Sequence, residues 1–292
     1  MIDLHTHSTA SDGTLSPHDL VREAVGEGLS AVAITDHDTT AGLDEGIRAA
    51  AGEKITFVGG VEISAEITPG SLHLVGLYID HQNSGLQAAL NWLVESRSSR
   101  NEELVQKLAF CGVPIALTEV KALARGSVIA RPHFAELMVK KGYVQSIAEA
   151  FDKYLGRGKA AYVPKRRLDR VKAIDAIRQA GGVPILAHPD QTLLRGDDLE
   201  QLVKELKNTG LEGIETRYTG YSKSKTRELN RLSRKYALVE SGGSDFHGSI
   251  KPEIKLGRGL GKLFVPDELL LPIAERAAEI RSRSHSNSFN SL

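Results

Sequence analysis

The sequence predicts an α/β fold, either a barrel or an open sheet of parallel strands, that is interrupted by a helical insertion. Short apolar segments alternate with amphipathic helical patterns along most of the chain, as in parallel sheets whose strands are buried on both faces. Residues 83–165 break this alternation, because they carry helical patterns without a convincing buried strand and are too long for a plain loop. The chain has 292 residues, of which 41% are apolar, enough for a large domain with a smaller one inserted.

The first strand and helix are predicted close to the N-terminus. Residues 2–5 form a short strand, and Ser16 caps a helix that begins at Pro17 and stops at Gly28. Further strands are expected at 30–35, 55–64, 71–80, 181–189, 211–216, 236–246 and 261–266, and further helices at 41–51, 168–177, 199–206 and 267–280. The barrel or open sheet therefore comprises residues 1–82 and 166–280, and residues 83–165 form a helical insertion that could cap a barrel. The Ser- and Asn-rich segment 281–292 is expected to be disordered.

Composition excludes several classes of protein. The 37 Lys and Arg residues balance 37 Asp and Glu residues, so no global field attracts nucleic acid. Cys111 is the only cysteine, which rules out an intrachain disulfide and fits a reducing, cytoplasmic compartment. No apolar run reaches the roughly 18 residues of a membrane span, and we expect no signal peptide before the first motif. We therefore expect a cytoplasmic globular protein without a membrane partner.

Nine residues with metal-binding side chains lie in or just after predicted strands or in the loops that follow them. His5 and His7 are two residues apart on a strand, so their side chains point the same way. In barrels and parallel sheets the loops after the strands converge at one edge, so all nine side chains are expected to meet there. The nine residues are His5, His7, Asp12, His37, Glu62, His73, His188, Asp245 and His247.

So many imidazoles and carboxylates in one pocket would be unfavourable without a cation. Nitrogen and carboxylate ligands suit Zn, Mn or Fe, and nine ligands exceed the needs of one ion, so two or three ions are implied. Bound ions lower the pKa of water to roughly 7 and hold phosphate oxygens, which suits phosphate ester hydrolysis. Asp3, Asp36 and Asp38 are expected to orient the histidines. Three histidines outside this set, His18, His81 and His285, are interpreted as structural or solvated.

Six motifs, DLHTHSTASDG, AITDHD, GGVEIS, HLVGLYID, AHP and GSDFH, resemble in order those of the PHP (polymerase and histidinol phosphatase) metal-dependent phosphoesterases. The resemblance covers residues 2–80 and 181–248 and implies a distorted, TIM-like (β/α)7 barrel with up to three metals. It implies one ion held by His5, His7, Glu62 and Asp245, a second held by Glu62, His73 and His188, and a third held by Asp12, His37 and His247. The candidate catalytic residues are His37, Glu62, His188, Asp245 and His247. Manganese is the expected metal, with Zn, Fe and Mg as alternatives.

The predicted insertion indicates which branch of the PHP family the chain resembles. Segments 94–113, 129–142 and 151–164 are similar to the PHP branch that contains RNase AM and the 3',5'-nucleotide bisphosphate phosphatases. That branch implies removal of the 3'-phosphate from adenosine 3',5'-bisphosphate and 5'-to-3' trimming of short RNA with a 5'-monophosphate, without an obligatory protein partner. The family often continues AHP with Gly-Arg-Tyr, whereas this chain has Asp190-Gln191-Thr192. This departure is expected to weaken a phosphate contact or to change the substrate range.

The insertion also carries candidate substrate-binding residues. Two arginines three residues apart share a helix face, and guanidinium groups bind phosphate in a bidentate manner. A second pair flanks a proline at a helix start, where free N–H groups favour an anion, and a third lies in a Gly-rich turn that could close over the substrate. These residues are Arg97 and Arg100, Arg131 and His133, and Lys159 and Tyr162. The basic segment 165–170 is interpreted as a solvated charge run rather than an RNA track.

Two other functions remain open at this stage. A phosphatase for a small metabolite such as histidinol phosphate would use the same centre on a substrate without a nucleoside. A non-catalytic metal-binding or interaction module would keep the fold without the reaction. The complete set of candidate ligands argues against this second alternative.

Overall fold

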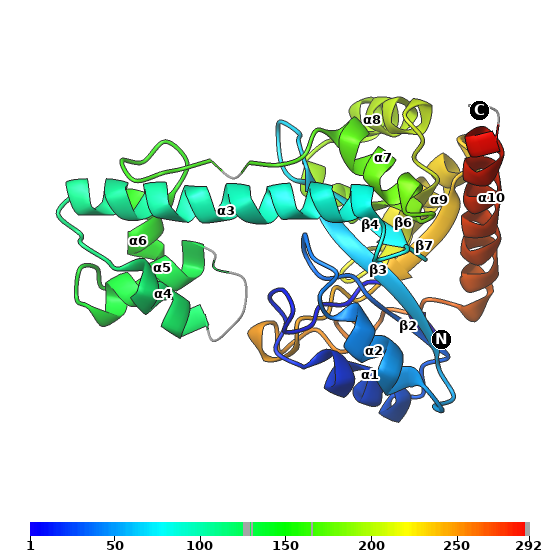
Figure 1. Cartoon of the computed structure of the whole chain (residues 1–292), viewed down its shortest axis with the longest axis horizontal. Helices are drawn as coiled ribbons and strands as arrows, with labels where there is room; N and C mark the ends of the chain where they lie inside the picture. Colours follow the sequence, from blue (N-terminus) through cyan, green and yellow to red (C-terminus); the bar gives the residue numbers. More distant parts are fainter. Residues whose placement is uncertain (125–128, 130, 165, 290–292) are drawn as a thin grey trace. The chain divides into compact units, whose positions relative to one another are not determined.

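The computed structural model describes residues 1–124, 129, 131–164 and 166–289, with side chains as far as residue 283. The chain divides into two compact units (Figure 1). Unit 1 comprises Met1–Leu90 and Arg167–Leu292, and unit 2 comprises Asn91–Arg166. The first boundary falls inside helix α3 (Ser84–Phe110), eight residues beyond the start of the insertion that the sequence predicts at residue 83.

Unit 1 contains a seven-stranded sheet in which the strands are neighbours in chain order. The strands are β1 (Ile2–Asp3), β2 (Ala31–Ile34), β3 (Thr56–Ala65), β4 (Leu72–Leu77), β5 (Val183–Ala187), β6 (Gly213–Tyr218) and β7 (Val239–Gly243). The first and last strands also meet, because Leu4 donates to the carbonyl of Gly242 (3.1 Å) and Asp245 donates to that of His5 (2.9 Å). The sheet is therefore nearly closed, which confirms the predicted barrel.

Strand β4 departs from the parallel arrangement that the sequence predicts. It runs antiparallel to both β3 and β5, with His73 opposite Ser64 and Ala187, whereas the other paired neighbours are parallel. Only six residues separate β3 from β4, too few for the crossover that a parallel pair requires. The start of β4 therefore lies at the edge where the parallel strands end.

Six α-helices of unit 1 follow its strands. They are α1 (Pro17–Gly26), α2 (Leu43–Ala50), α7 (Arg170–Gln179), α8 (Gly196–Asn208), α9 (Lys223–Lys235) and α10 (Leu270–Phe289). Side chains cap several of them: Ser16 accepts from Asp19 N–H, Asp169 from Val171 N–H, and Ser222 from Lys225 N–H. Residues Ile273, Ala277 and Ile280 of α10 pack in the same core as the strand residues Ile2, Leu4, Val75 and Ile185.

Two segments near the C-terminus differ from expectation. No strand forms over 261–266, because the chain turns at Gly261 (φ +87°). The Val265 carbonyl then accepts a hydrogen bond from Ile2 N–H at 3.0 Å, but the two segments form no strand ladder. The segment 281–292 was expected to be disordered, yet α10 continues to Phe289, and residues 290–292 lie outside the described part of the chain. Extending an existing helix fixes one residue at a time without a new nucleus, which favours this continuation.

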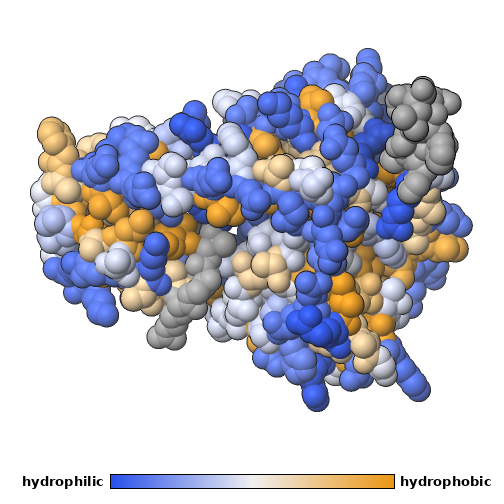
Figure 2. Space-filling view, viewed as in Figure 1, coloured by the Kyte–Doolittle hydropathy of each residue, from blue (hydrophilic) through white to orange (hydrophobic). Residues whose placement is uncertain are grey.

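The regular secondary structure among the described residues of unit 2 is helical. It contains most of α3, together with α4 (Leu117–Ala124), α5 (Arg131–Lys140), α6 (Ile147–Ala150) and a π-helical turn at Phe151–Leu155. Its core includes Leu104, Leu108, Phe134 and Met138, all fully buried. Figure 2 shows apolar residues gathered between α3 and the short helices. In the described residues, no helix is both long and apolar enough to cross a membrane.

Closure of the barrel depends on a glycine in β7. A Cβ atom added at Gly243 would lie 2.4 Å from the Cβ of His5 and 2.5 Å from its backbone nitrogen. We expect Gly243→Ala to lower the free energy of unfolding by about 1–3 kcal/mol, because neither strand can retreat from a packed barrel. Gly26→Ala, at the end of α1 where an added Cβ meets nothing within 4 Å, is the matched control and should not destabilise. Equal unfolding midpoints in denaturant for the two variants would contradict this account.

Candidate metal centre

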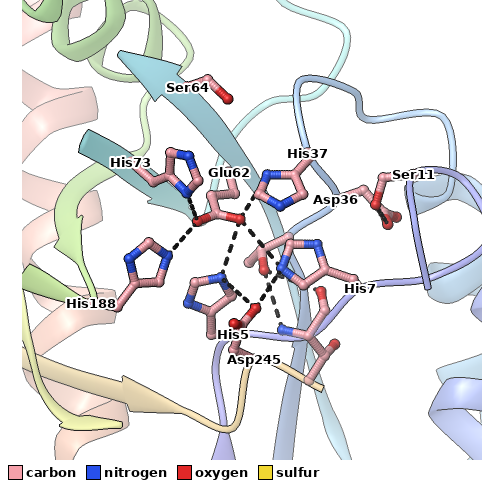
Figure 3. Close-up of polar contacts among 12 residues, drawn as sticks. His5, His7, Ser11, Asp36, His37, Glu62, Ser64, His73, His188 and Asp245 are labelled. Atoms are coloured by element: carbon pink, nitrogen blue, oxygen red, sulfur yellow. Dashed lines mark hydrogen bonds and ion pairs between the residues drawn. The ribbon is translucent and has the colours of Figure 1, made fainter. Parts of the chain in front are cut away.

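The carboxylate of Glu62, fully buried in β3, lies at the centre of a group of histidines (Figure 3). Its Oε1 atom is 2.8 Å from both His73 Nδ1 and His188 Nε2. Its Oε2 atom faces three further rings: His37 Nδ1 at 2.9 Å, His7 Nε2 at 3.3 Å and His5 Nε2 at 3.4 Å. The two oxygens thus face separate sets of imidazoles, as expected of a carboxylate that bridges two ions.

Two aspartates complete the centre. Asp245 Oδ1 lies 3.1 Å from His7 Nε2 and 3.8 Å from His5 Nε2, and Asp12 Oδ1 lies 3.4 Å from His247 Nε2. Ligand atoms within 4.8 Å of one another form four overlapping groups: His7–Asp12–His37–His247, His5–His7–Asp245, His5–Glu62–His188 and His37–Glu62–His73. The structure therefore brings together all nine residues singled out in the sequence, which are called the histidine–carboxylate cluster below.

The barrel positions these residues at one edge. His5 and His7 follow β1, and Thr6 between them pairs with Phe246, so both rings face the interior. His188 directly follows β5 and Asp245 follows β7, with φ angles of +25° and +56°. Non-glycine residues rarely adopt this left-handed conformation, and its presence at two cluster positions marks local strain of the kind found at functional sites.

The ring of His5 is oriented by a carboxylate that the sequence analysis missed. Glu215 in β6 accepts a hydrogen bond from His5 Nδ1 at 2.8 Å through Oε1 and from the His188 backbone N–H at 2.6 Å through Oε2. Its side chain is buried, so this contact fixes which nitrogen of His5 faces Glu62. The available signal was an acidic residue inside an apolar strand pattern, LEGIET.

The aspartates expected to orient the histidines accept hydrogen bonds from the segments that carry the cluster. Asp3 accepts hydrogen bonds from Ser244 N–H (2.9 Å), Ser244 Oγ (2.6 Å) and Gly257 N–H (2.7 Å). Asp36 accepts from the backbone of Ser8 (2.7 Å) and the hydroxyl of Ser11 (2.6 Å), and Asp38 from Ser64 N–H (2.9 Å). These carboxylates therefore fix the loops that carry the cluster, because backbone N–H groups and serine hydroxyls surround them.

Asp245 is held by two further residues outside the predicted site. The hydroxyl of Tyr218 donates to Asp245 Oδ2 at 2.8 Å, and Lys251 Nζ lies 3.2 Å from the same oxygen. Burial raises the pKa of Tyr218, so its phenol remains a donor. One oxygen of Asp245 is thereby anchored while the other faces the histidines.

Electrostatics set the charge of several cluster residues. Burial lowers the pKa of His5, but the neighbouring Glu215 and Glu62 outweigh it and hold that pKa well above its usual range. Burial, with His37 and His247 nearby, lowers the pKa of His7 to about 3, and burial lowers the pKa of His73 to about 4. Burial raises the pKa of Glu62, but the neighbouring His37, His73 and His5 outweigh it and hold that pKa well below its usual range. At neutral pH His7 and His73 are therefore neutral and Glu62 is ionised, as divalent ions require of their ligands.

Several cluster atoms also lack the partners that burial normally demands. Within the described residues, His5 Nε2, both ring nitrogens of His7 and Glu62 Oε2 are buried without a hydrogen bond. Nδ1 of His5 contacts Glu215, and its Nε2 faces Glu62 Oε2 at 3.4 Å, so two buried atoms without hydrogen bonds lie next to each other. A cation between them provides the partner that both atoms lack. The donors therefore fit divalent metal ions of the kind that imidazole and carboxylate bind.

Comparison with known proteins agrees with this chemistry. The PHP domain family matches residues 3–210. The chain belongs to the PHP family. It is 40% identical to a 5'-3' exoribonuclease of Haemophilus influenzae over 84% of this chain and 89% of that protein. It is also 33% identical to a 3',5'-nucleoside bisphosphate phosphatase of Chromobacterium violaceum, over 84% of this chain and 87% of the relative.

Solved structures show the same fold. A protein of Bifidobacterium adolescentis described as a metal-dependent phosphoesterase has a TM-score of 0.78 at 30% identity, covering 94% of this chain and 96% of its own. An amidohydrolase of Chromobacterium violaceum, solved with bound sulfate and no metal, has a TM-score of 0.77 at 31% identity and covers 96% of each chain. The PHP barrel assignment thus rests on sequence and on structure.

Outside the cluster, the PHP chain places the other noted residues apart from it. Exposed His18 has its Nδ1 3.2 Å from Asp19, and partly buried His81 has its Nε2 2.9 Å from Asp44. The side chain of His285 falls outside the described part. Asp190, the unusual residue after AHP, pairs with Lys225 Nζ at 2.8 Å. This pairing offsets the negative charge that the departure from the family pattern introduces.

The candidate substrate-binding residues lie in unit 2. Arg131 donates to the Leu155 carbonyl at 3.2 Å, and its guanidinium lies 5.2 Å from the ring centre of Tyr162. Burial, followed by the neighbouring Arg97 and Arg131, lowers the pKa of Arg100 to about 10, so it remains a cation at neutral pH. The three arginines therefore lie near one another, and Arg131 contacts Tyr162. His133 lies in α5 and Lys159 is exposed in the loop before Tyr162.

The role of Glu215 is testable through metal affinity. Glu215→Gln keeps the shape but replaces a charged acceptor, so we expect divalent-metal affinity to fall about 10–100-fold. Equilibrium dialysis and thermal shift against Mn²⁺ concentration measure this effect. Glu268→Gln, exposed before α10, is the matched control. If both variants bind Mn²⁺ as the wild type does, Glu215 does not position the ligands.

Proposed function

We propose that this PHP protein is a phosphoesterase acting on nucleotides. It hydrolyses the 3'-phosphate of nucleoside 3',5'-bisphosphates and removes nucleotides from the 5' end of short 5'-phosphorylated RNA. The observation that carries the proposal is the buried Glu62 carboxylate between two sets of imidazoles, which suits adjacent divalent ions. The relatives named exoribonuclease and bisphosphate phosphatase support the substrate class.

We propose two or three ions, with manganese as the physiological metal. His5, His7, Glu62 and Asp245 would hold the first, and Glu62, His73 and His188 the second, whereas Asp12, His37 and His247 would hold the third. Bound ions of this kind activate water and neutralise charge on phosphoryl oxygens. Glu62 fixes the spacing of the sites, His7 and His73 present neutral nitrogens, and Tyr218 with Lys251 keeps Asp245 in place.

One bond cleavage accounts for both substrates. Water adds to phosphorus, the bond between phosphorus and the 3' oxygen breaks, and the 3' oxygen takes up a proton. From a bisphosphate the products are a 5'-mononucleotide and inorganic phosphate. From RNA the products are a 5'-mononucleotide and a strand that again carries a 5'-phosphate, so the cycle can repeat. The same residues therefore serve a small molecule and an RNA end.

The non-reacting 5'-phosphate is assigned to unit 2. Arg97, Arg100 and Arg131 present guanidinium groups near one another, and Tyr162 stacks against Arg131. Such groups bind phosphate with charge-assisted hydrogen bonds. We include His133 and Lys159 in this set because they lie on the same helix as Arg131 and in the loop of Tyr162.

A substrate panel tests the reaction. With Mn²⁺-loaded enzyme, adenosine 3',5'-bisphosphate and 5'-phosphorylated RNA should be hydrolysed in preference to histidinol phosphate in steady-state assays. Asp245→Asn should lower kcat about a thousandfold, equivalent to about 4 kcal/mol of transition-state stabilisation. Asp198→Asn, exposed in α8, should behave as the wild type does. A preference for histidinol phosphate would favour a small-metabolite phosphatase. A protein that binds fewer than two metal ions and hydrolyses no substrate in added Mn²⁺ would be a non-catalytic module.

Recognition of the 5'-phosphate is tested separately. Arg131→Ala should lower kcat/KM for adenosine 3',5'-bisphosphate about 10–100-fold, since a charge-assisted contact contributes about 1.5–3 kcal/mol. The value for adenosine 3'-monophosphate, which lacks the 5'-phosphate, should change little. Arg157→Ala, exposed in the same unit, is the control. Equal losses on both substrates would show that Arg131 does not bind the 5'-phosphate.

A further inference from the structure

A groove on unit 1 adjoins the histidine–carboxylate cluster. It has a volume of about 640 Å³ and is lined by residues within 217–227, from the end of β6 into α9, and within 260–264. Tyr218 lines it at one side and donates to Asp245 Oδ2 at 2.8 Å. The ring of Tyr218 also lies 5.4 Å from that of His188. Tyr218 therefore lies between this β6–α9 groove and the candidate metal centre, lining the first and contacting the second.

The β6–α9 groove is cationic. Its lining includes Arg217, Lys223, Arg227 and Lys262 and no acidic residue. Arg217 is paired with Glu240 at 2.8 Å, whereas Lys223, Arg227 and Lys262 are exposed and make no ion pair among the residues that the structure describes. In a chain with zero net charge, three uncompensated cations around one groove form a local site for a polyanion.

The same groove presents apolar surface to solvent. Phe264 is 62% exposed and Leu260 54% exposed, although both line it. Tyr221, whose ring lies 5.3 Å from that of Tyr218, adds a second aromatic face. Cations that follow a backbone, combined with exposed rings on which bases stack, characterise grooves for single-stranded nucleic acid.

We propose that the β6–α9 groove binds the RNA nucleotides that follow the scissile phosphate. This inference rests on the proposed function. A nucleoside bisphosphate ends at the reacting phosphate, whereas an RNA strand continues beyond it and must leave the cluster across the surface of the protein. Lys223, Arg227 and Lys262 contact the phosphates of that strand, and Phe264 stacks on a base. The groove thereby adds affinity for RNA without altering the reacting bond.

The test compares substrates of different length. The triple variant Lys223→Ala, Arg227→Ala, Lys262→Ala removes three charges, and Lys54→Ala, Lys172→Ala, Lys204→Ala removes three from exposed positions outside the groove. We measure kcat/KM with Mn²⁺ for adenosine 3',5'-bisphosphate and for 5'-phosphorylated RNA of two to eight nucleotides. The groove variant should lower the ratio of the eight-nucleotide RNA to the bisphosphate about 10–100-fold. For RNA, the plot of log kcat/KM against log salt concentration should become shallower by about 2 in slope.

Phe264→Ala should lower the same ratio, because a stacked base contributes about 1–3 kcal/mol. An unchanged ratio in the groove variant, or an equal fall in the control, overturns the groove. If the wild type hydrolyses neither substrate, the proposed function fails. A measurement of RNA binding then tests the groove independently of catalysis. Fluorescence anisotropy with labelled, 5'-phosphorylated RNA of eight nucleotides should give a Kd at least tenfold weaker for the groove variant, and an equal Kd overturns the assignment. Circular dichroism checks that all variants are folded.

Discussion

A single buried carboxylate, Glu62, determines the arrangement of the functional end of the barrel. Removing an ion from water carries a penalty of several kcal/mol, which close hydrogen bonds and opposite charges offset. The chain supplies five imidazoles around Glu62, and they come from β1, β2, β4 and β5 or the loops that follow. These segments are far apart in sequence, so the compensation exists only when the barrel is closed. Fold and site are therefore stabilised by the same contacts.

The antiparallel β4 strand is what lets His73 join this arrangement. In the β3–β4 ladder, Ser64 pairs with His73 and Glu62 with Val75, so Glu62 and His73 are diagonal neighbours on one face. Their side chains meet at 2.8 Å. If β4 were parallel to β3, its second residue, His73, would lie at the opposite edge of the sheet. The short connection between β3 and β4 thus reverses the chain and places His73 beside Glu62.

Sequence reasoning finds residues whose chemistry is distinctive and fails for those whose role comes from a distant partner. His5, Glu62 and Asp245 stand out because metal-binding side chains recur in and beside predicted strands. Glu215, also a glutamate in a predicted strand, is missed because only its contact with His5, 210 positions away, reveals its role. The segment 261–266 fits a strand in its sequence, but the structure buries Val265 and leaves Lys262 and Phe264 exposed in a loop beside β1. Local patterns therefore predict the ligands, and tertiary contacts decide what supports them.

The β6–α9 groove explains how a neutral protein can act on a polyanion. Strong, uniform positive charge would hold RNA tightly along its whole length and would slow release after each cleavage. Three unpaired cations and one exposed ring provide a weak contact confined to one side of the cluster. Each cleavage shortens the strand by one nucleotide, so the remaining RNA must shift by one position before the next. A groove that grips the backbone lightly permits this shift, whereas the metal centre, where Glu62 and Asp245 are fixed by many contacts, keeps the reacting phosphate in register.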